Sequence, residues 1–232
     1  MGGASYVVTA AGRLQLFGVE HWAILTVFTA VAVATFRLGR RPAPASRRIE
    51  VLAGTVLAAT CAPFEAIDWT HGPQLQLCDF AWIASAGALL TGRPSWSAPA
   101  YFWGLTLSVQ GVLTPDLSHG FPSLEFWGFV VRHLAPVWVG IYLVAARRGP
   151  SWRALALTVL LTSAWAAAVM AINSTRGTNY GYLNGKPPTH SLLDLLGPWP
   201  LYVVLEIALI VALWTLMTWP WNRADSRNAP DQ

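Results

Sequence analysis

Apolar residues form long stretches along the chain, and polar residues gather in the short segments between them. A helix that spans the hydrocarbon core of a membrane needs about 20 mostly apolar residues. Seven segments meet or approach this length, and the third and fourth are short. The seven expected spans are Phe17–Phe36, Ile49–Ile67, Leu75–Leu90, Ala98–Leu113, Glu125–Ala145, Trp152–Ile172 and Trp199–Trp219. The pattern predicts an all-α, polytopic membrane helical bundle of about seven transmembrane helices.

The polar segments predict the boundaries of this bundle. Pro94 and Pro99 are expected to fix the break between the third and fourth spans, because proline interrupts a helix. A single seven-helix transmembrane domain is expected over residues 1–221, with a disordered cytoplasmic tail over 222–232. The segment 173–200 is long for a connection in a bundle. Within it, Ser191 and Asp194 have the spacing of a capping box, which favours a short helix lying at the interface.

Composition narrows the class of protein further. The 232 residues are 54% hydrophobic and 11% charged, with a mean hydropathy of +0.45. Soluble domains carry roughly 25% charged residues, so this chain lacks the polar surface of a soluble fold. The net charge of +4 does not indicate nucleic acid, because the basic residues cluster in short loops. No zinc-binding, phosphate-binding or nucleophile-elbow motif is present. We therefore expect no cofactor, no metal and no nucleic-acid partner.

The distribution of lysine and arginine predicts the orientation. Cytoplasmic loops of membrane proteins carry an excess of basic residues. Eleven arginines fall on one side of the predicted spans, and three basic residues fall on the other. The eleven are Arg37, Arg40, Arg41, Arg47, Arg48, Arg93, Arg147, Arg148, Arg153, Arg223 and Arg227; the three are Arg13, Arg176 and Lys186. The N-terminus is expected outside and the C-terminus in the cytoplasm, in a multi-pass protein of the cell membrane.

Ionisable residues inside the spans are the candidate functional residues, because a charge in hydrocarbon is costly and needs a partner. With the predicted orientation, all of them fall in the outer half of the bundle. They are Glu20, His21, Glu65, Asp68, Asp79, Arg132, His133 and Glu206. The orientation rests on the basic loops alone, so the common location of these residues in the outer half is an independent observation. It predicts one polar cavity that opens outward.

Three of these charged groups have an alternative interpretation that is structural. Arg132 forms either an ion pair with an acidic neighbour, most readily Asp79, or part of a binding site. Glu20 and Glu206 each either lie at the interface or form a hydrogen bond at a helix end, or they contribute to the cavity. A metal site built from His21, Asp79, His133 and Glu65 has no supporting spacing in the sequence.

The reactive side chains likewise have two interpretations. His133 is either a satisfied core residue or a general base, because histidine titrates near neutral pH. Cys78 is either a small apolar residue or a reactive thiol at the start of a helix, where backbone amides favour the thiolate. A disulfide between Cys61 and Cys78 is a further alternative.

Several short strings carry a resemblance to a known family. They are Leu77–Asp79, Tyr101–Gly104, Leu113–Leu117, Gly177–Tyr180 and, most specifically, Ser191–Pro200. Together they resemble the YwaF-like family of bacterial integral membrane proteins, over about Glu20 to Glu206. That family is similar to an animal membrane acyltransferase that remodels ether phospholipids. The string Tyr180-Gly-Tyr182 departs from the resemblance, which leads us to expect a bulky residue at position 181.

The resemblance implies a lipid acyltransferase with a cysteine nucleophile and a histidine base. Carried over by position, the catalytic residues would be Cys78 and His133, with Asp79 orienting the pair or neutralising charge. Membrane lipids would be the partners and a phospholipid the candidate substrate. The expected substrate-binding residues are Glu65, Asp68, Arg132, Asn173, Asn179, Tyr180 and Glu206. The alternatives are a non-catalytic binder or transporter of a small polar solute, and a purely structural partner of another membrane protein.

Overall fold

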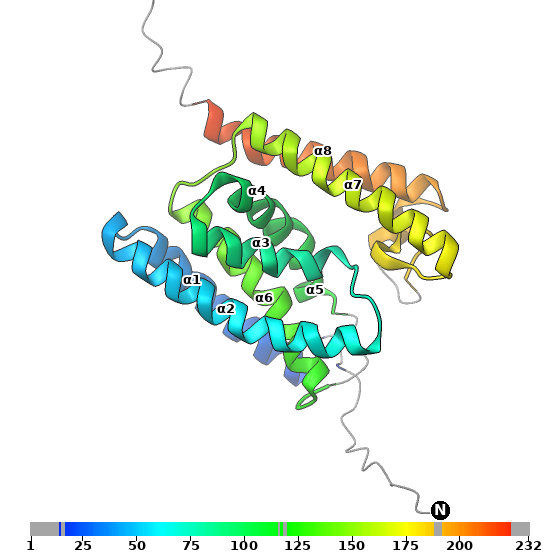
Figure 1. Cartoon of the computed structure of the whole chain (residues 1–232), viewed down its shortest axis with the longest axis horizontal. Coiled ribbons are helices and arrows are strands. Elements are labelled where there is room, and N and C mark those ends of the chain that lie inside the picture. The colour runs from blue at the N-terminus through cyan, green and yellow to red at the C-terminus, as the bar shows by residue number, and fades with distance from the viewer. Residues whose placement is uncertain (1–13, 15–16, 116, 118–119, 188–191, 224–232) are drawn as a thin grey trace, which may run out of the picture.

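The computed structural model describes residues 14, 17–115, 117, 120–187 and 192–223, and helices account for most of them (Figure 1). The expected disordered tail lies outside these residues from position 224 onward. The elements are α1 (Val19–Gly39), α2 (Ala43–His71), α3 (Leu77–Thr91), α4 (Pro94–Phe102), the π-helix η1 (Trp103–Leu107), α5 (Ser108–Leu113), α6 (Leu124–Ala145), α7 (Trp152–Arg176), the 3-10 helices η2 (Tyr180–Tyr182) and η3 (Leu192–Leu196), and α8 (Leu201–Asn222).

The predicted class of fold, a helical membrane bundle, is confirmed. Five helices of the described part are long and apolar enough to cross a membrane, namely α1, α2 from Arg47, α6, α7 and α8. The apolar helix α3 is shorter, as the sequence indicated. The segments α4, η1 and α5 follow one another without a gap from Pro94 to Leu113 and form a further helical passage.

Proline acts differently from the expectation in this region. The break between the third and fourth passages falls at Gly92 and Arg93, where Gly92 adopts a left-handed conformation with φ of 67°. Pro94 begins α4, a position that suits proline because the first helical N–H has no partner in any case. Pro99 lies inside α4 and does not form the break.

Helix α6 lies at the centre of the bundle, with α1, α2, α3 and α4 around it (Figure 1). The π-turn at η1 passes close to it: a side chain at Gly104 would meet the carbonyl oxygen of Pro136 at 2.3 Å. Only glycine allows the two backbones to approach so closely. This contact fixes the position of the passage formed by α4, η1 and α5 along the axis of α6.

The pair α7 and α8 lies along one side of this group, beyond α4 (Figure 1). Hydrogen bonds between tryptophans and hydroxyls cross this boundary. Trp103 donates to Thr162 at 3.0 Å, and Trp214 donates to Thr106 at 3.2 Å. Near the end of α8, Trp221 donates to the Tyr101 hydroxyl at 3.2 Å. Aromatic residues with one polar atom therefore join two apolar layers and leave no indole N–H of these three unpaired.

Contacts at the helix ends sort the connections into two groups, as the loop charges predicted. At the end we call inner, Arg47 donates to the carbonyls of Leu89 and Leu90, and Asn222 donates to that of Pro150. At the opposite, outer end, the Tyr180 hydroxyl donates to the carbonyl of Pro73 at 2.7 Å. Which end faces the cytoplasm remains the prediction made from the basic residues.

Candidate functional site

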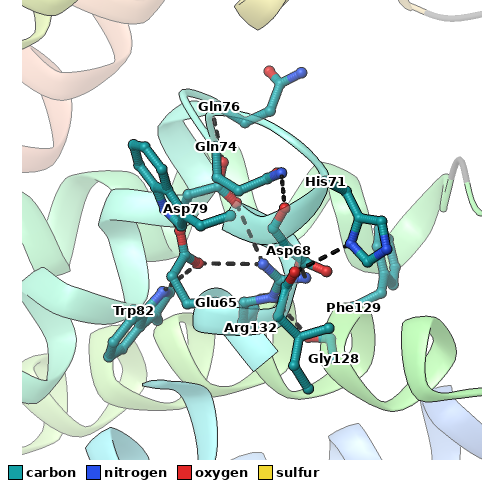
Figure 2. Close-up of polar contacts among 12 residues, drawn as sticks. Glu65, Asp68, His71, Gln74, Gln76, Asp79, Trp82, Gly128, Phe129 and Arg132 are labelled. Carbon is teal, nitrogen blue, oxygen red and sulfur yellow. Dashed lines mark hydrogen bonds and ion pairs between the residues drawn. The ribbon is translucent and has the colours of Figure 1, made fainter. Parts of the chain in front are cut away.

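An ion cluster at the outer end centres on Arg132 of α6 (Figure 2). Its Nη2 lies 2.5 Å from Oδ2 of Asp68, and its Nη1 lies 3.3 Å from Oε2 of Glu65. The third carboxylate is that of Asp79 on α3, with Oδ1 3.7 Å from Nη1. The structure therefore brings together four of the residues that the sequence singled out. We call these four the outer cluster.

Local structure explains how each side chain is held in the outer cluster. Glu65 and Asp68 are three residues apart and share one face of α2. Asp79 occupies the third position of α3 and accepts a hydrogen bond from the Gln76 backbone N–H at 2.9 Å, which completes a capping box. Arg132 also donates from Nε to the Gly128 carbonyl at 3.1 Å.

Two tryptophans complete the environment of Glu65. Trp69 donates to Oε1 at 3.0 Å and Trp82 donates to Oε2 at 3.3 Å (Figure 2). The expected pairing of Arg132 with Asp79 is confirmed, but Asp68 and Glu65 lie closer to the guanidinium. One guanidinium set against three carboxylates leaves a formal charge of −2 in the cluster.

Both cysteines are free, so the alternative of a Cys61–Cys78 disulfide is wrong. Cys61 is fully buried within the core of α2, α3, α4 and α6. Cys78 is only partly buried and lies in the first turn of α3, beside Asp79. Both thiols lie near the outer cluster, Cys61 one turn before Glu65 on α2 and Cys78 beside Asp79 at the start of α3.

His133 follows Arg132 on α6 but faces a different neighbour. Its ring stacks on Phe129 with centroids 4.1 Å apart, and Nδ1 lies 2.9 Å from the Phe129 carbonyl oxygen. A carbonyl accepts, so Nδ1 carries the proton and Nε2 keeps its lone pair in the neutral ring. A side chain at Gly111 would lie 2.8 Å from Nε2, so glycine makes room for the imidazole.

No hydrogen bond joins Cys78 to His133 in the described part of the chain. Their chain neighbours, however, contact each other directly through the ion pair of Asp79 with Arg132. The His133 ring itself packs against α5 and α1, beside Gly111, Val112 and Ile24. The catalytic assignment of Cys78 and His133 stays a prediction.

His21, the other histidine within a predicted span, has both ring nitrogens occupied. Nδ1 accepts from the Phe17 backbone N–H at 3.0 Å, so Nε2 is the protonated nitrogen that donates to the Val112 carbonyl at 3.0 Å. The ring is fully buried and ties the start of α1 to α5. Among the described residues, no three His, Cys, Asp or Glu side chains are grouped as metal ligands.

The expected substrate-binding residues of the outer loop organise the loop itself. The Asn173 amide donates to the Tyr180 carbonyl and to the Asn184 side chain, both at 3.0 Å. Asn179 donates to the Gly185 carbonyl at 2.7 Å. The loop then covers α3, because the Gly181 N–H donates to the Gln76 side chain at 2.7 Å. A role of these residues in substrate binding stays a prediction.

Glycine at position 181 is required by the packing, contrary to the bulky residue that the resemblance suggested. Its φ is 65°, and a side chain there would meet the ring of Trp165 at 2.6 Å. The departure from the family pattern therefore serves the contact between the loop and α7.

The expected short helix in this loop is present as η3, although Ser191 lies outside the described residues.

Glu206 lies apart from the outer cluster, on α8. It is partly buried and forms no hydrogen bond or ion pair with any described residue. Tyr202, one turn earlier, is fully buried, and its hydroxyl donates to the Tyr182 carbonyl of the loop. Glu206 is thus held near the loop, and its predicted role remains untested.

Sequence reasoning missed a second ion cluster, at the inner end. Glu50 of α2 is buried and lies 3.0 Å from Arg47 and 2.8 Å from Arg148. It also accepts a short hydrogen bond from the Tyr142 hydroxyl of α6. We call these four residues the inner cluster. The available signal was the spacing of Arg47 and Glu50, which suits an ion pair within one helix.

Fold and site together define a multi-pass helical membrane protein with a polar cluster in the outer half and a covering outer loop. The model of the TMEM164 family matches residues 16–218, and the chain belongs to that family. The expected membrane-protein family over most of the chain is thereby confirmed, while its narrower assignment to a YwaF-like bacterial group stays a prediction. No curated protein and no solved structure matches the chain.

Proposed function

We propose that this protein transfers fatty acyl groups between phospholipids, with Cys78 as nucleophile and His133 as general base. The observation that supports the proposal is the Asp79–Arg132 ion pair, because Cys78 and His133 are the sequence neighbours of its two partners. The thiol at a helix start and the imidazole with a free Nε2 are the two groups that thioester chemistry needs.

The proposed reaction has two steps. His133 Nε2 takes the thiol proton while the sulfur attacks the ester carbonyl of a donor phospholipid. The ester C–O bond breaks, the proton passes to the departing lysophospholipid oxygen, and a thioester forms on Cys78. In the second step the hydroxyl of an acceptor lysophospholipid gives its proton to His133 and attacks the thioester. The thiolate leaves, takes back a proton, and the enzyme is restored.

The outer cluster acts mainly as support in this proposal. Asp79 caps α3 and pairs with Arg132, so it is a positioning residue for Cys78. Sulfur and Nε2 must approach to about 3–4 Å when substrate is bound, and catalytic hydrogen bonds are often longer without substrate. Glu65, Asp68 and Arg132 would contact the head group of the substrate.

The test is acyl transfer by the full chain in liposomes. Vesicles would hold a phospholipid with an isotopically labelled acyl chain and an acceptor lysophospholipid, and mass spectrometry would follow the label. We expect transfer, and a hydroxylamine-sensitive acyl adduct on Cys78. Cys78→Ser should abolish both. Cys61→Ser is the matched control, because its thiol is fully buried, and it should retain activity.

A second candidate function has one specific observation in its favour. The formal charge of −2 in the outer cluster suits a binder or transporter of a small cationic solute. Such a protein has no need of a thiol. Solute uptake that survives Cys78→Ser but is lost in Asp68→Asn, with no acyl transfer in the wild type, would favour this alternative over the enzyme.

A further inference from the structure

A cavity of about 170 Å³ lies between α1, α2, α3 and α6 in the inner half of the bundle. Its walls come from the inner halves of these helices, whereas Cys78 lies at the outer end, in the first turn of α3. The lining residues are Thr35, Leu38, Ile49, Glu50, Ala53, Leu57, Leu89, Ala135, Trp138, Val139 and Tyr142. The surface that they present to the cavity is almost entirely apolar.

The cavity is a groove with a buried floor and an open side. Leu57, Leu89 and Val139 form the floor and are buried. Ala53 on the rim is exposed, and Leu38 and Ile49 are partly exposed. Helix α1 packs on α6 in its outer half, through Ile24 and Phe28, and again at its inner end, where Gly39 lies against Ala145. The open side of the groove therefore lies between α1 and α2, where Ala53 is exposed.

The physical properties of the groove select a hydrocarbon occupant. Apolar cavities of about 150 Å³ stay dry and bind a molecule as large as benzene. Water is therefore a poor filling for this groove. At this depth in a membrane the molecules at its open side are the acyl chains of lipids, and a segment of one chain has the size and chemistry to enter.

The charge around the groove selects the kind of lipid. Arg37 lies in the last turn of α1, Arg40 directly follows that helix, and Arg48 lies in the second turn of α2; all three are exposed. They stand at the inner ends of the two helices between which the groove opens. Guanidinium groups bind phosphate well, often through two hydrogen bonds. Basic residues at this position also attract anionic lipids of the adjoining leaflet.

We infer that this groove is a binding site for an anionic phospholipid of the leaflet at the inner end. One acyl chain lies along the floor, and the phosphate lies among Arg37, Arg40 and Arg48. The acyl chain of the lipid covers Glu50 and Tyr142, which line the groove and belong to the inner cluster. A bound lipid would thus keep water away from these buried polar groups and stabilise the bundle.

The inference can be tested by photolabelling the full chain in liposomes. The probe is phosphatidylglycerol with a diazirine in its acyl chain, and the comparison probe is phosphatidylcholine with the same chain. We expect adducts in peptides of α1, α2 and α6 that contain lining residues, with stronger labelling by phosphatidylglycerol. Equal labelling by both probes, or adducts spread over all lipid-facing helices, would overturn the site.

Two variants of α2 separate occupancy from general exposure. Ala53→Trp places a large ring on the rim of the groove and should remove most of the labelling. Ala59→Trp is the matched control: Ala59 is exposed on the same helix but does not line the groove. The proposal fails if both variants label alike.

Head-group recognition has its own variant and readout. The triple variant Arg37→Gln, Arg40→Gln, Arg48→Gln should lower the preference for phosphatidylglycerol by roughly fivefold for each charge removed. Phosphatidylglycerol should also raise the melting temperature of wild-type protein and of Ala59→Trp, and leave Ala53→Trp unaffected. Stabilisation of all three proteins to the same extent would contradict the groove as the site.

Discussion

The inner and outer clusters both tie α2 to α6, yet they carry opposite excess charge. At the inner end a single carboxylate, Glu50, lies between the guanidiniums of Arg47 and Arg148. At the outer end a single guanidinium, Arg132, lies among three carboxylates. The inner anion is 1% exposed while its partners are 43% and 36% exposed. All four side chains of the outer cluster are at least partly covered.

The difference separates a structural device from a candidate site. Arg47 and Arg148 turn their guanidiniums toward the buried acid and neutralise it, and Arg47 also donates to the carbonyls at the end of α3. The outer cluster instead gathers surplus negative charge in a covered position, next to a thiol and an imidazole. Uncompensated charge inside a membrane is costly, so the outer cluster, rather than the inner one, is the candidate functional site.

The first prediction concerns the orientation of the two clusters in the membrane, for which the labelling result is either present or absent. In a background without Cys61 and Cys78, Thr175→Cys at the outer end should react with an impermeant thiol reagent in intact cells. Ser95→Cys, exposed between α3 and α4 at the inner end, should react only after the cells are opened. The reverse result would place the inner cluster outside and overturn the predicted orientation.

The largest energetic effect is expected at Glu50. Glu50→Gln keeps the shape of the side chain but leaves Arg47 and Arg148 without a counter-charge. Removing one partner of a buried ion pair costs about 3 kcal/mol or more. Thermal unfolding in nanodiscs should show a large decrease in melting temperature. Glu125→Gln, in the exposed first turn of α6, is the control and should differ little from wild type. Equal shifts for the two variants would rule out a structural role for the inner cluster.

A double-mutant cycle ranks the partners of Arg132. Arg132→Ala should destabilise the protein, and combination with Asp68→Asn should recover part of the loss. We expect a coupling energy of about 1–3 kcal/mol. It should be larger for Asp68, at 2.5 Å, than for Asp79, at 3.7 Å. Additive effects in both cycles would show that the guanidinium is not held by these carboxylates.

The smallest effect is expected between the two layers, away from both clusters. Thr106→Val preserves volume but leaves the buried Trp214 N–H without its acceptor. A lost hydrogen bond of this kind costs about 1 kcal/mol within a membrane bundle. Thr215→Val is the matched control, because the Thr215 hydroxyl is exposed and bonds only to its own helix. A change in melting temperature no larger than that of the control would show that the Trp214–Thr106 hydrogen bond does not stabilise the contact between the two layers.

Much of the fold followed from the sequence, because membrane helices are long and the bilayer imposes their length. An ion pair of Arg132 with an acidic neighbour, most readily Asp79, was one of two interpretations that the sequence supported, because a charge inside a span needs a partner. The arrangement of three carboxylates around the guanidinium, with Asp68 nearest, could not be predicted, because it depends on how α2, α3 and α6 pack.

Other features had only a weak signal in the sequence, such as the helical spacing of Arg47 and Glu50. Glu50 stood among arginines at the edge of a predicted span, where a charge usually lies in water. Its burial depends on Tyr142 and Arg148, which are distant in sequence. The π-turn at Trp103–Leu107 is likewise invisible in the hydrophobic pattern, because its residues are as apolar as those of an ordinary membrane helix. Tertiary contacts decide both.

The inner cluster also implies an order of assembly during biosynthesis. Arg47 and Glu50 lie within one turn of α2, so their ion pair can form as soon as that helix leaves the ribosome. Tyr142 and Arg148 are synthesised much later, with α6 and the connection that follows it. The early pair would shield the acid while α2 waits in the translocon or the lipid, and the arrival of α6 would then fasten the first half of the bundle before α7 and α8 are added.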